Sequence, residues 1–262
     1  MRIISLVDNV PGCCPGEHGL SLWIELKSGL KVLFDTGQGS LFAENAARLG
    51  LDLAAIDIAV ISHGHYDHGG GLNTFLELNS KARVHLRPTF FEPHYSLKEC
   101  GLKNISPAPV DPRHADRLVF SGDPCEGLTL FSSVCSDFPA PAGNSNLFGS
   151  DGVTPDDFCH EQNLIIRENG KTFLFAGCAH RGAANIITDA VKIAGNGIDY
   201  FIGGMHLMRA EEGFDSLAET LSSFEGCRYL TMHCTGEDSY RRLKEKMGDS
   251  ICYLACGASV TL

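Results

Sequence analysis

The segment from Ser62 to Gly71 constrains this chain more than any other, because it puts four potential metal ligands directly after an apolar stretch. It reads Ser-His-Gly-His-Tyr-Asp-His-Gly-Gly-Gly, and residues 56–61 before it have the character of a buried strand. The fold must therefore end a core strand in a loop that gathers polar side chains. Three histidines and an aspartate at this density favour a metal site over a polar turn or packed core histidines.

The spacing within this segment predicts two sets of ligands. In an extended chain successive side chains alternate, so His63, His65 and Asp67 can share one side while His68 points elsewhere. His63 and His65 could then bind one ion, and Asp67 and His68 a second. Imidazole and carboxylate ligands without a thiolate disfavour a closed structural zinc site. We expect one or two divalent ions, zinc first, with manganese, iron or magnesium as alternatives, and an open coordination position that supports chemistry.

Composition narrows the classes of partner. The 262 residues are 44% hydrophobic and 20% charged, as in an ordinary globular protein. The formal charge of −11 argues against nucleic-acid binding, and neither a membrane span nor a secretory signal is recognisable. The odd number of cysteines, 11, without a Cys-X-X-Cys pair, indicates reduced thiols. We expect a cytoplasmic protein with a small-molecule substrate, and leave the oligomeric state open.

Strand-like and helix-like segments alternate along the chain, which predicts an α/β (α+β) protein with sheets between helical layers, in one domain spanning 1–262. Antiparallel strands are expected to open it, and a hairpin is expected to turn at Asn169-Gly170. Two long segments lack periodicity, 87–116 as a surface stretch and 138–157 as a lid or binding loop. Expected strands are 3–7, 20–26, 30–34, 56–61, 82–86, 117–120, 128–132, 163–176, 198–202, 228–232 and 251–254; expected helices are 41–49, 72–78, 183–194, 216–224 and 239–247.

Three more histidines stand where a predicted strand stops: His180, His206 and His233. In layered α/β folds functional groups gather at strand ends, so these side chains could converge with the first cluster. Each alone is as consistent with a structural histidine as with a ligand. Because the predicted metal site needs further ligands, we expect all three histidines to be candidate metal ligands.

The run from His63 to His68 is similar to the signature of the metallo-β-lactamase superfamily, and Leu33-Phe34-Asp35-Thr36-Gly37 resembles its first motif. A finer resemblance covers nearly the whole chain and points to the branch of 7,8-dihydropterin-6-methyl-4-(β-D-ribofuranosyl)aminobenzene-5'-phosphate synthases, also described as metal-dependent hydrolases of β-lactamase superfamily II. It is carried by Asp8-Asn9 and by the segments 17–21, 177–187, 203–207 and 233–236.

The resemblance implies a four-layer αβ/βα sandwich with the metals at one edge, between the sheets. His63 and His65 would bind the first ion, and His233 would join Asp67 and His68 on the second. Asp35 would orient the ligand loop through hydrogen bonds without touching metal.

Two places depart from the wider superfamily. The bridging carboxylate is expected after a glycine at a strand end, where this chain has Cys178, with His180 two residues later. We expect His180 to be a ligand and Cys178 to be either a thiolate ligand or a neighbour. The usual third histidine of the first site would fall near residues 159–162, which makes His160 and Glu161 reserve candidates.

The expected function is that of a metal-dependent hydrolase-like enzyme that uses a metal-bound hydroxide on a small, phosphorylated or pterin-type substrate, because a divalent ion lowers the pKa of water to roughly 7. The related condensation with loss of a phosphate group would make it a transferase. Asp67 would handle the proton of that water and His206 would act as a second catalytic group, with His18 and Arg181 facing the substrate.

Other functions share the histidine run. A thioesterase or lactonase like glyoxalase II is the main alternative. Nucleic-acid phosphodiesterases conflict with the acidic charge. Flavin-linked di-iron oxygen reductases usually have Glu where His65 stands. A non-catalytic metal-binding or sensing protein is the alternative from another class.

Overall fold

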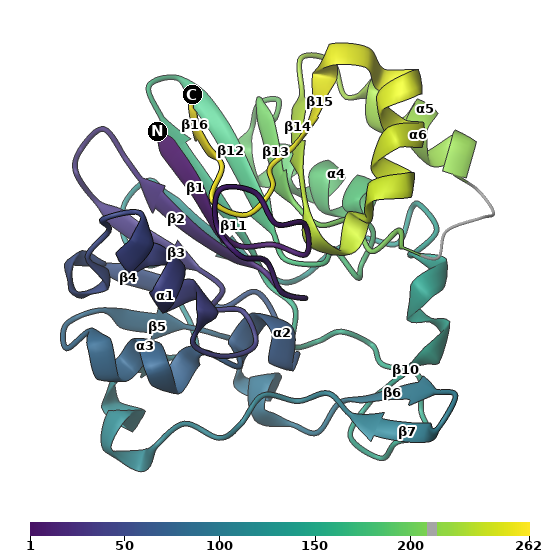
Figure 1. Cartoon of the computed structure of the whole chain (residues 1–262). Helices are drawn as coiled ribbons and strands as arrows, with labels where there is room; N and C mark the ends of the chain where they lie inside the picture. The colour runs from purple at the N-terminus through teal and green to yellow at the C-terminus, as the bar shows by residue number, and fades with distance from the viewer. Residues whose placement is uncertain (209–213) are drawn as a thin grey trace.

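Two large β-sheets lie face to face between two helical layers in the computed structural model (Figure 1). The structure describes residues 1–208 and 214–262. Helices α1 (Leu41–Arg48) and α3 (Leu72–Leu78) cover the outer face of the first sheet. Helices α4 (Ala183–Ala194), α5 (Phe214–Ser223) and α6 (Glu237–Met247) cover the outer face of the second. The expected α/β class and the four-layer αβ/βα arrangement are confirmed.

The first sheet is built mainly from the N-terminal half of the chain. Its first three strands along the chain are antiparallel, as predicted, and the next two continue the sheet in parallel. The strand at 259–261 was not expected from the sequence, because a three-residue stretch between small and polar residues gives no readable alternation. In spatial order the strands are β16 (Ser259–Thr261), β1 (Arg2–Val7), β2 (Ser21–Glu25), β3 (Lys31–Phe34), β4 (Ile58–Val60), β5 (Arg83–His85) and β8 (Leu118–Val119).

The second sheet is built from the C-terminal half. The predicted hairpin is confirmed, with Asn169 and Gly170 in the left-handed region as a tight two-residue turn requires. On one side of the hairpin the further strands pair in parallel, and on its other side one more strand pairs antiparallel. In spatial order the strands are β15 (Ile251–Tyr253), β14 (Arg228–Thr231), β13 (Tyr200–Gly203), β12 (Lys171–Ala176), β11 (Asn163–Glu168) and β9 (Leu128–Phe131).

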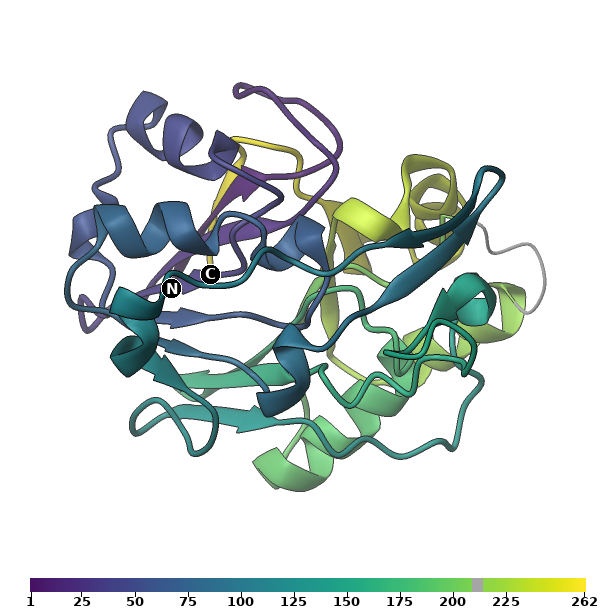
Figure 2. The ribbon, with the colours of Figure 1, turned by 90° about the horizontal axis from the view of Figure 1, so that it is seen from below.

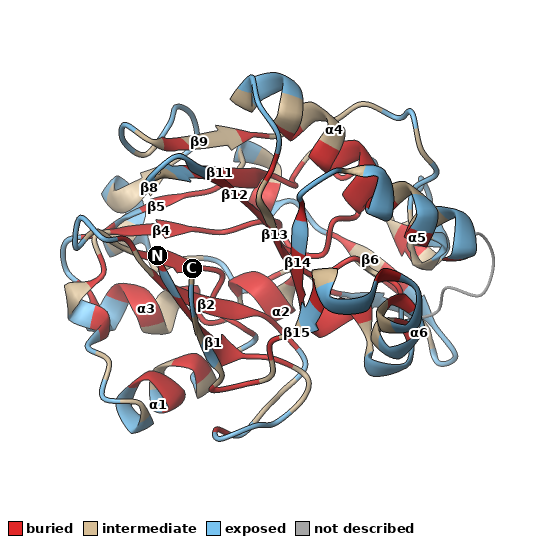
Figure 3. Cartoon of the chain, turned by 90° about the horizontal axis from the view of Figure 1, so that it is seen from above, coloured by how far each residue is buried: buried red, intermediate tan, exposed pale blue. Residues whose placement is uncertain are grey.

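Alternating side chains divide the core into layers. On β2, Leu22 and Ile24 face the second sheet, whereas Trp23 packs beneath the helices. On β12, Phe173 and Phe175 fill the space between the sheets. Burial is accordingly concentrated in the strands and on the inner helix faces (Figure 3). No helix in the described part of the chain combines the length and apolarity needed to cross a bilayer.

The expectation that segment 87–116 lacks regular structure is wrong. It forms a hairpin of β6 (Tyr95–Lys98) and β7 (Gly101–Asn104), to which β10 (Leu147–Phe148) from the second supposedly irregular segment adds a third strand. This small sheet projects away from both large sheets (Figures 1 and 2). The hairpin escaped prediction because its leucines face outward, so it has no buried apolar face. Short 3-10 helices occupy Leu53–Ala55, Pro88–Phe91, Pro112–Arg117, Ala142–Asn146, His233–Thr235 and Gly248–Ser250.

Candidate metal centre

Four strands from the two large sheets end near the candidate ligands, and each is followed within three residues by a left-handed residue that is not glycine. These residues are Asp35 after β3, Ala179 after β12, His206 after β13 and His233 after β14, with φ values of 62°, 53°, 52° and 50°. Such conformations are uncommon outside glycine and cluster at functional sites. The sharp turns direct side chains from both sheets toward one edge of the sandwich.

The ligand loop follows β4 and is extended only as far as His65. Tyr66 begins the short helix α2 (Tyr66–Gly69), with His65 as its N-terminal cap. The expectation of strict alternation through Asp67 and His68 is therefore wrong, since these two residues lie on a helical turn. The turn nevertheless separates the side chains into the two expected pairs.

The first group consists of His63, His65 and His180. One ring nitrogen of His63 lies 3.0 Å from one of His65, and one potential ligand atom from each histidine lies within 4.8 Å of the others. The Nε2 atoms of His65 and His180 are buried, and among the described residues neither has a hydrogen-bond partner. Buried imidazole nitrogens left unpartnered are the atoms that a cation would satisfy.

The second group consists of Asp67, His68, His233 and Cys178. His68 Nε2 lies 3.1 Å from His233 Nε2, 3.1 Å from Cys178 Sγ and 3.9 Å from Asp67 Oδ2. Asp67 Oδ2 is 3.4 Å from His233 Nε2. Cys178 also forms a candidate ligand set with His63 and His68, so its thiol lies between the two groups.

Burial and mutual repulsion set the protonation of these side chains. Both effects hold the pKa values of His63, His65 and His180 well below the ordinary 6.5, so the rings are neutral at pH 7. Burial would raise the pKa of Asp67, but His68 and the hydrogen bonds from His18 and His233 hold it well below its usual range. Neutral imidazoles and an ionised carboxylate are the forms that bind metal.

Two buried carboxylates, those of Asp35 and Asp8, fix candidate metal ligands in place through hydrogen bonds. Asp35 accepts hydrogen bonds from the Ser62 backbone N–H at 2.6 Å and from His68 Nδ1 at 2.7 Å. Asp8 accepts the backbone N–H of His233, whose Nδ1 lies 2.8 Å from Asn9 Oδ1. A carboxylate behind a histidine fixes the ring so that its other nitrogen faces the metal, which is the role expected of Asp35.

Residues 15–135 match the sequence profile of the Metallo-beta-lactamase superfamily. Over its full length the chain also superposes on a crystal structure of a metal-dependent hydrolase of the beta-lactamase superfamily, with a TM-score of 0.83, 28% identity and coverage of 100% and 99% of the two chains. This chain has the metallo-beta-lactamase fold. The Zn²⁺-bound PqqB of Methylobacterium extorquens shares the fold at 16% identity, with a TM-score of 0.58 and coverage of 100% of both chains.

The chain is also similar in sequence to a protein of the dihydropterin-linked synthase branch. The 7,8-dihydropterin-6-methyl-4-(beta-D-ribofuranosyl)-aminobenzene-5'-phosphate synthase of Methanocaldococcus jannaschii is 28% identical, and the match covers 92% of this chain and 88% of that protein. An uncharacterized protein of the same organism is 26% identical, with coverage of 87% and 88%. These similarities confirm the resemblance to this branch of metallo-beta-lactamase proteins.

The structure places the reserve candidates His160 and Glu161 behind the ligands. His160 Nδ1 accepts the backbone N–H of Gly64 at 2.9 Å, and its Nε2 lies 3.2 Å from Asp156 Oδ2. Glu161 accepts the backbone N–H groups of His180 and Arg181 at 2.7 and 3.1 Å. Since these ring nitrogens and carboxylate oxygens already have partners, the geometry suits both residues to positioning the ligand loops.

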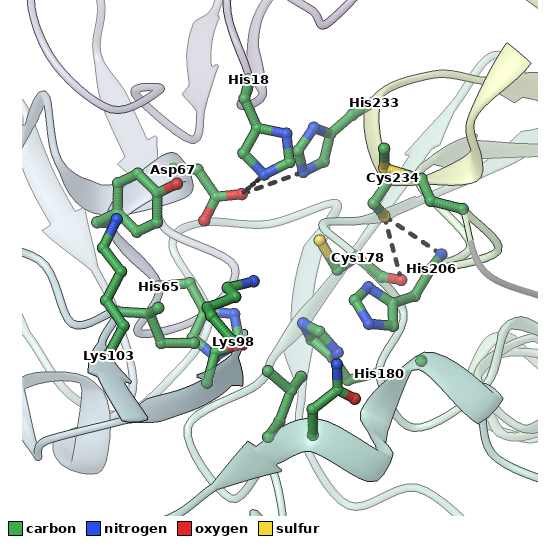
Figure 4. Close-up of a pocket in the computed structure, with 17 residues that line it drawn as sticks. His18, His65, Asp67, Lys98, Lys103, Cys178, His180, His206, His233 and Cys234 are labelled. Atoms are coloured by element: carbon green, nitrogen blue, oxygen red, sulfur yellow. Dashed lines mark hydrogen bonds and ion pairs between the residues drawn. The ribbon is translucent and has the colours of Figure 1, made fainter. Parts of the chain in front are cut away.

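A cavity of about 210 Å³ opens over the two ligand groups, and Figure 4 shows His18, His206 and Cys234 on its wall. His18 Nε2 lies 3.0 Å from Asp67 Oδ2. The His206 ring packs 4.4 Å from that of His180, and its buried Nδ1 has no hydrogen-bond partner in the described part of the chain. Arg181 does not appear among the described residues that line this cavity, unlike the other predicted substrate contact, His18.

The sequence interpretation missed several residues around this cavity. Lys98 and Lys103 reach it from the unexpected β6–β7 hairpin. His94 packs 3.8 Å from the ring of His160 and shares the carboxylate of Asp156 with it. Cys234 follows His233 directly, and this adjacency to a predicted ligand was the available signal. The lysines offered none, because they lie in a segment without readable periodicity.

Proposed function

We propose that this chain is a metal-dependent hydrolase-like enzyme that acts on a small, phosphorylated or pterin-type substrate. The observation that carries the proposal is the pair of ligand groups at the floor of an open cavity, with the Nε2 atoms of His65 and His180 buried and unpartnered among the described residues. A closed structural site would need its ligands sealed from solutes, whereas catalytic sites keep a position open.

The donor set fits one or two divalent ions. His63, His65 and His180 would hold the first, and Asp67, His68 and His233 the second, with Cys178 available to either. A thiol beside imidazoles favours zinc over magnesium or calcium. Burial raises the pKa of Cys178, so this thiol keeps its proton unless a cation replaces it. When bound, the ions would supply an activated water and would polarise the bond under attack.

The protein's own groups would control the protons. Asp67 Oδ2, 3.0 Å from His18 Nε2, can accept a proton from a water on the cavity floor and share it with that ring. His206 stands on the opposite wall, where its ring can donate a hydrogen bond to a leaving group. Asp67 would thus act as the base and His206 as the acid, with His18 orienting the carboxylate.

The similarity to the pterin-linked phosphate synthase supports the choice of substrate class. That relative's name describes a product with both a phosphate and an aromatic ring system, and a condensation with loss of a phosphate group would use the same cavity. The similarity to a metal-dependent hydrolase supports bond cleavage by water. We place hydrolysis first and the transfer reaction second.

The test combines metal content with a substrate panel. Elemental analysis of the purified protein should find one or two zinc ions per chain, and His65→Ala should lower both metal content and turnover by at least about tenfold.

The substrate panel contains a phosphomonoester, a phosphodiester, an acyl thioester, a lactone and a dihydropterin. His114→Ala is the matched control, because His114 lies on a 3-10 helix and is not among the described residues that line the cavity. Activity confined to the thioester or lactone would replace the proposal with the glyoxalase II-like alternative. Metal without turnover would favour a sensing protein.

A further inference from the structure

One face of the β6–β7 hairpin, which carries the exposed lysines Lys98 and Lys103, lines the cavity, and the other face carries two exposed leucines. Ser96 pairs with Lys103 and Lys98 with Gly101, so Ser96, Lys98 and Lys103 share one face, and all three line the cavity. Leu97 and Leu102 pair on the other face and are 50% and 46% exposed. A strand pair on a protein surface normally shows the opposite pattern. Packing within the protein does not explain this orientation, whereas a ligand in the cavity would.

The two lysines have no anionic partner in the described structure. Across residues 1–208 and 214–262, no ion pair involves Lys98 or Lys103, although the chain carries a net charge of −11. Lys103 Nζ lies 5.8 Å from the centre of the Tyr66 ring, which keeps it beside the ligand helix α2. Figure 4 shows both lysines on the side of the cavity that carries His65 and Asp67.

The surroundings favour an anion with two charges. The nearby carboxylate of Asp67 is engaged by His18, so it does not neutralise the ammonium groups. Two like charges facing a shared cavity repel each other unless an anion joins them. Ser96 on the hairpin and Asn146, which directly precedes the β10 strand paired with β6, add neutral hydrogen-bonding groups. Charged donors with neutral ones around a small cavity match the several acceptor oxygens of a phosphate.

We propose that Lys98 and Lys103 form an anion-binding subsite that holds a phosphate group of the substrate over the metal centre. The proposal rests on the proposed function, which it deepens by assigning the phosphate of the substrate to this hairpin. It makes the two lysines specificity-determining residues: they bind the phosphate dianion, while the histidine groups act on the bond beside it.

The test measures binding without turnover. Phenylphosphonate, a dianion with no ester bond to hydrolyse, is titrated into zinc-loaded protein by calorimetry, beside benzoate and neutral benzyl alcohol. Lys98→Gln and Lys103→Gln should each weaken phenylphosphonate binding about tenfold, the effect of one charge-assisted hydrogen bond. Benzoate should bind more weakly and respond less. Lys27→Gln, which removes an exposed lysine from the turn between β2 and β3, should change nothing.

The double substitution Lys98→Arg with Lys103→Arg keeps both charges and should retain most of the affinity. Unchanged phenylphosphonate binding in both Gln variants would overturn the subsite, as would a wild-type protein that binds benzyl alcohol equally well. Repeating the titration on metal-free protein separates the two proposals, because lysine-dependent binding can persist there. A protein that binds phenylphosphonate through the lysines but turns over no substrate would refute the hydrolase proposal alone.

Discussion

Glu161 shows how a single buried residue couples the ligand loops to pH. Its side chain is 1% exposed and receives the backbone N–H groups of His180 and Arg181. Burial raises the pKa of this carboxyl from 4.5 to about 7, although both hydrogen bonds oppose the shift. Between these two values the folded chain binds a proton that the unfolded chain releases. The stability contributed by Glu161 is therefore complete below about pH 4.5 and is lost as pH rises through 7.

Replacing Glu161 by Gln should remove this pH dependence. In metal-free protein, the free energy of unfolding of the wild type should fall relative to Glu161→Gln by about 3 kcal/mol between pH 4.5 and pH 8, which is 1.36 kcal/mol for each pKa unit of the shift. Urea denaturation at several pH values measures the difference, and the titrating histidines cancel because both proteins contain them. Exposed Glu225→Gln serves as the control. A constant difference between wild type and variant would show that Glu161 stays ionised.

Among single residues, the sequence was informative where a side chain able to bind metal directly follows the end of an apolar strand. His63, His180 and His233 each follow an apolar strand, and strands in layered sheets end at a common edge, so their convergence could be anticipated. The left-handed turn that aims His180 left no comparable signal, because Ala179 is not a residue that favours such a conformation. Asp156, the partner of His160, and Asn144, whose Oδ1 lies 3.0 Å from His180 Nδ1, belong to the connection between β9 and β11, whose course depends on the folded core.

Among the elements, the short helix α2 depends on close backbone contact. Gly71 follows it at the start of α3, and a Cβ at this position would meet the carbonyl oxygens of Thr36 and Gly39. Gly71 has a negative φ of −84°, so the requirement for glycine comes from space and not from backbone conformation. The glycines after the histidine run thus hold the ligand helix against the turn that contains Asp35.

Gly71→Ala should destabilise the fold by roughly 1–3 kcal/mol, as inserting a methyl group into a packed site does. Because the displaced helix carries Asp67 and His68, the variant should also lose bound metal. Gly39→Ala is the matched control, since a Cβ there meets nothing within 4 Å. Thermal unfolding and elemental analysis of both variants make the comparison. Equal stability and equal metal content would show that this contact does not position the helix.

The strands and hairpins differ in how well the local sequence predicts them. Strands such as β4 and β12 were predictable because they are buried on both faces and read as continuous apolar runs. The hairpin at Asn169-Gly170 was predictable from its turn residues. The β6–β7 hairpin was not, because Leu97 and Leu102 face solvent and its inward face carries polar side chains. Its orientation makes sense only once the cavity beneath it is known.

On the scale of the whole molecule, the candidate metal centre joins the two sheets. His63, His65, Asp67 and His68 come from the first sheet, and Cys178, His180 and His233 come from the second. The apolar core between the sheets holds the rest of that interface, from Ile3 and Leu22 to Phe173 and Ile202. A cation at this edge would therefore cross-link the sandwich in the folded state alone. Metal binding and global stability should be coupled.

Removing the metal should lower the midpoint of thermal unfolding. A ligand at one hundred times its dissociation constant stabilises the native state by about 2.7 kcal/mol, which corresponds to roughly 5–10 °C for a chain of this size. Scanning calorimetry with and without a chelator, followed by zinc addition, measures this increment. His180→Ala should reduce it because the second sheet loses one of its ligands, whereas His114→Ala should preserve it. An increment unchanged in His180→Ala would show that His180 does not contribute to the link that the ion makes between the two sheets.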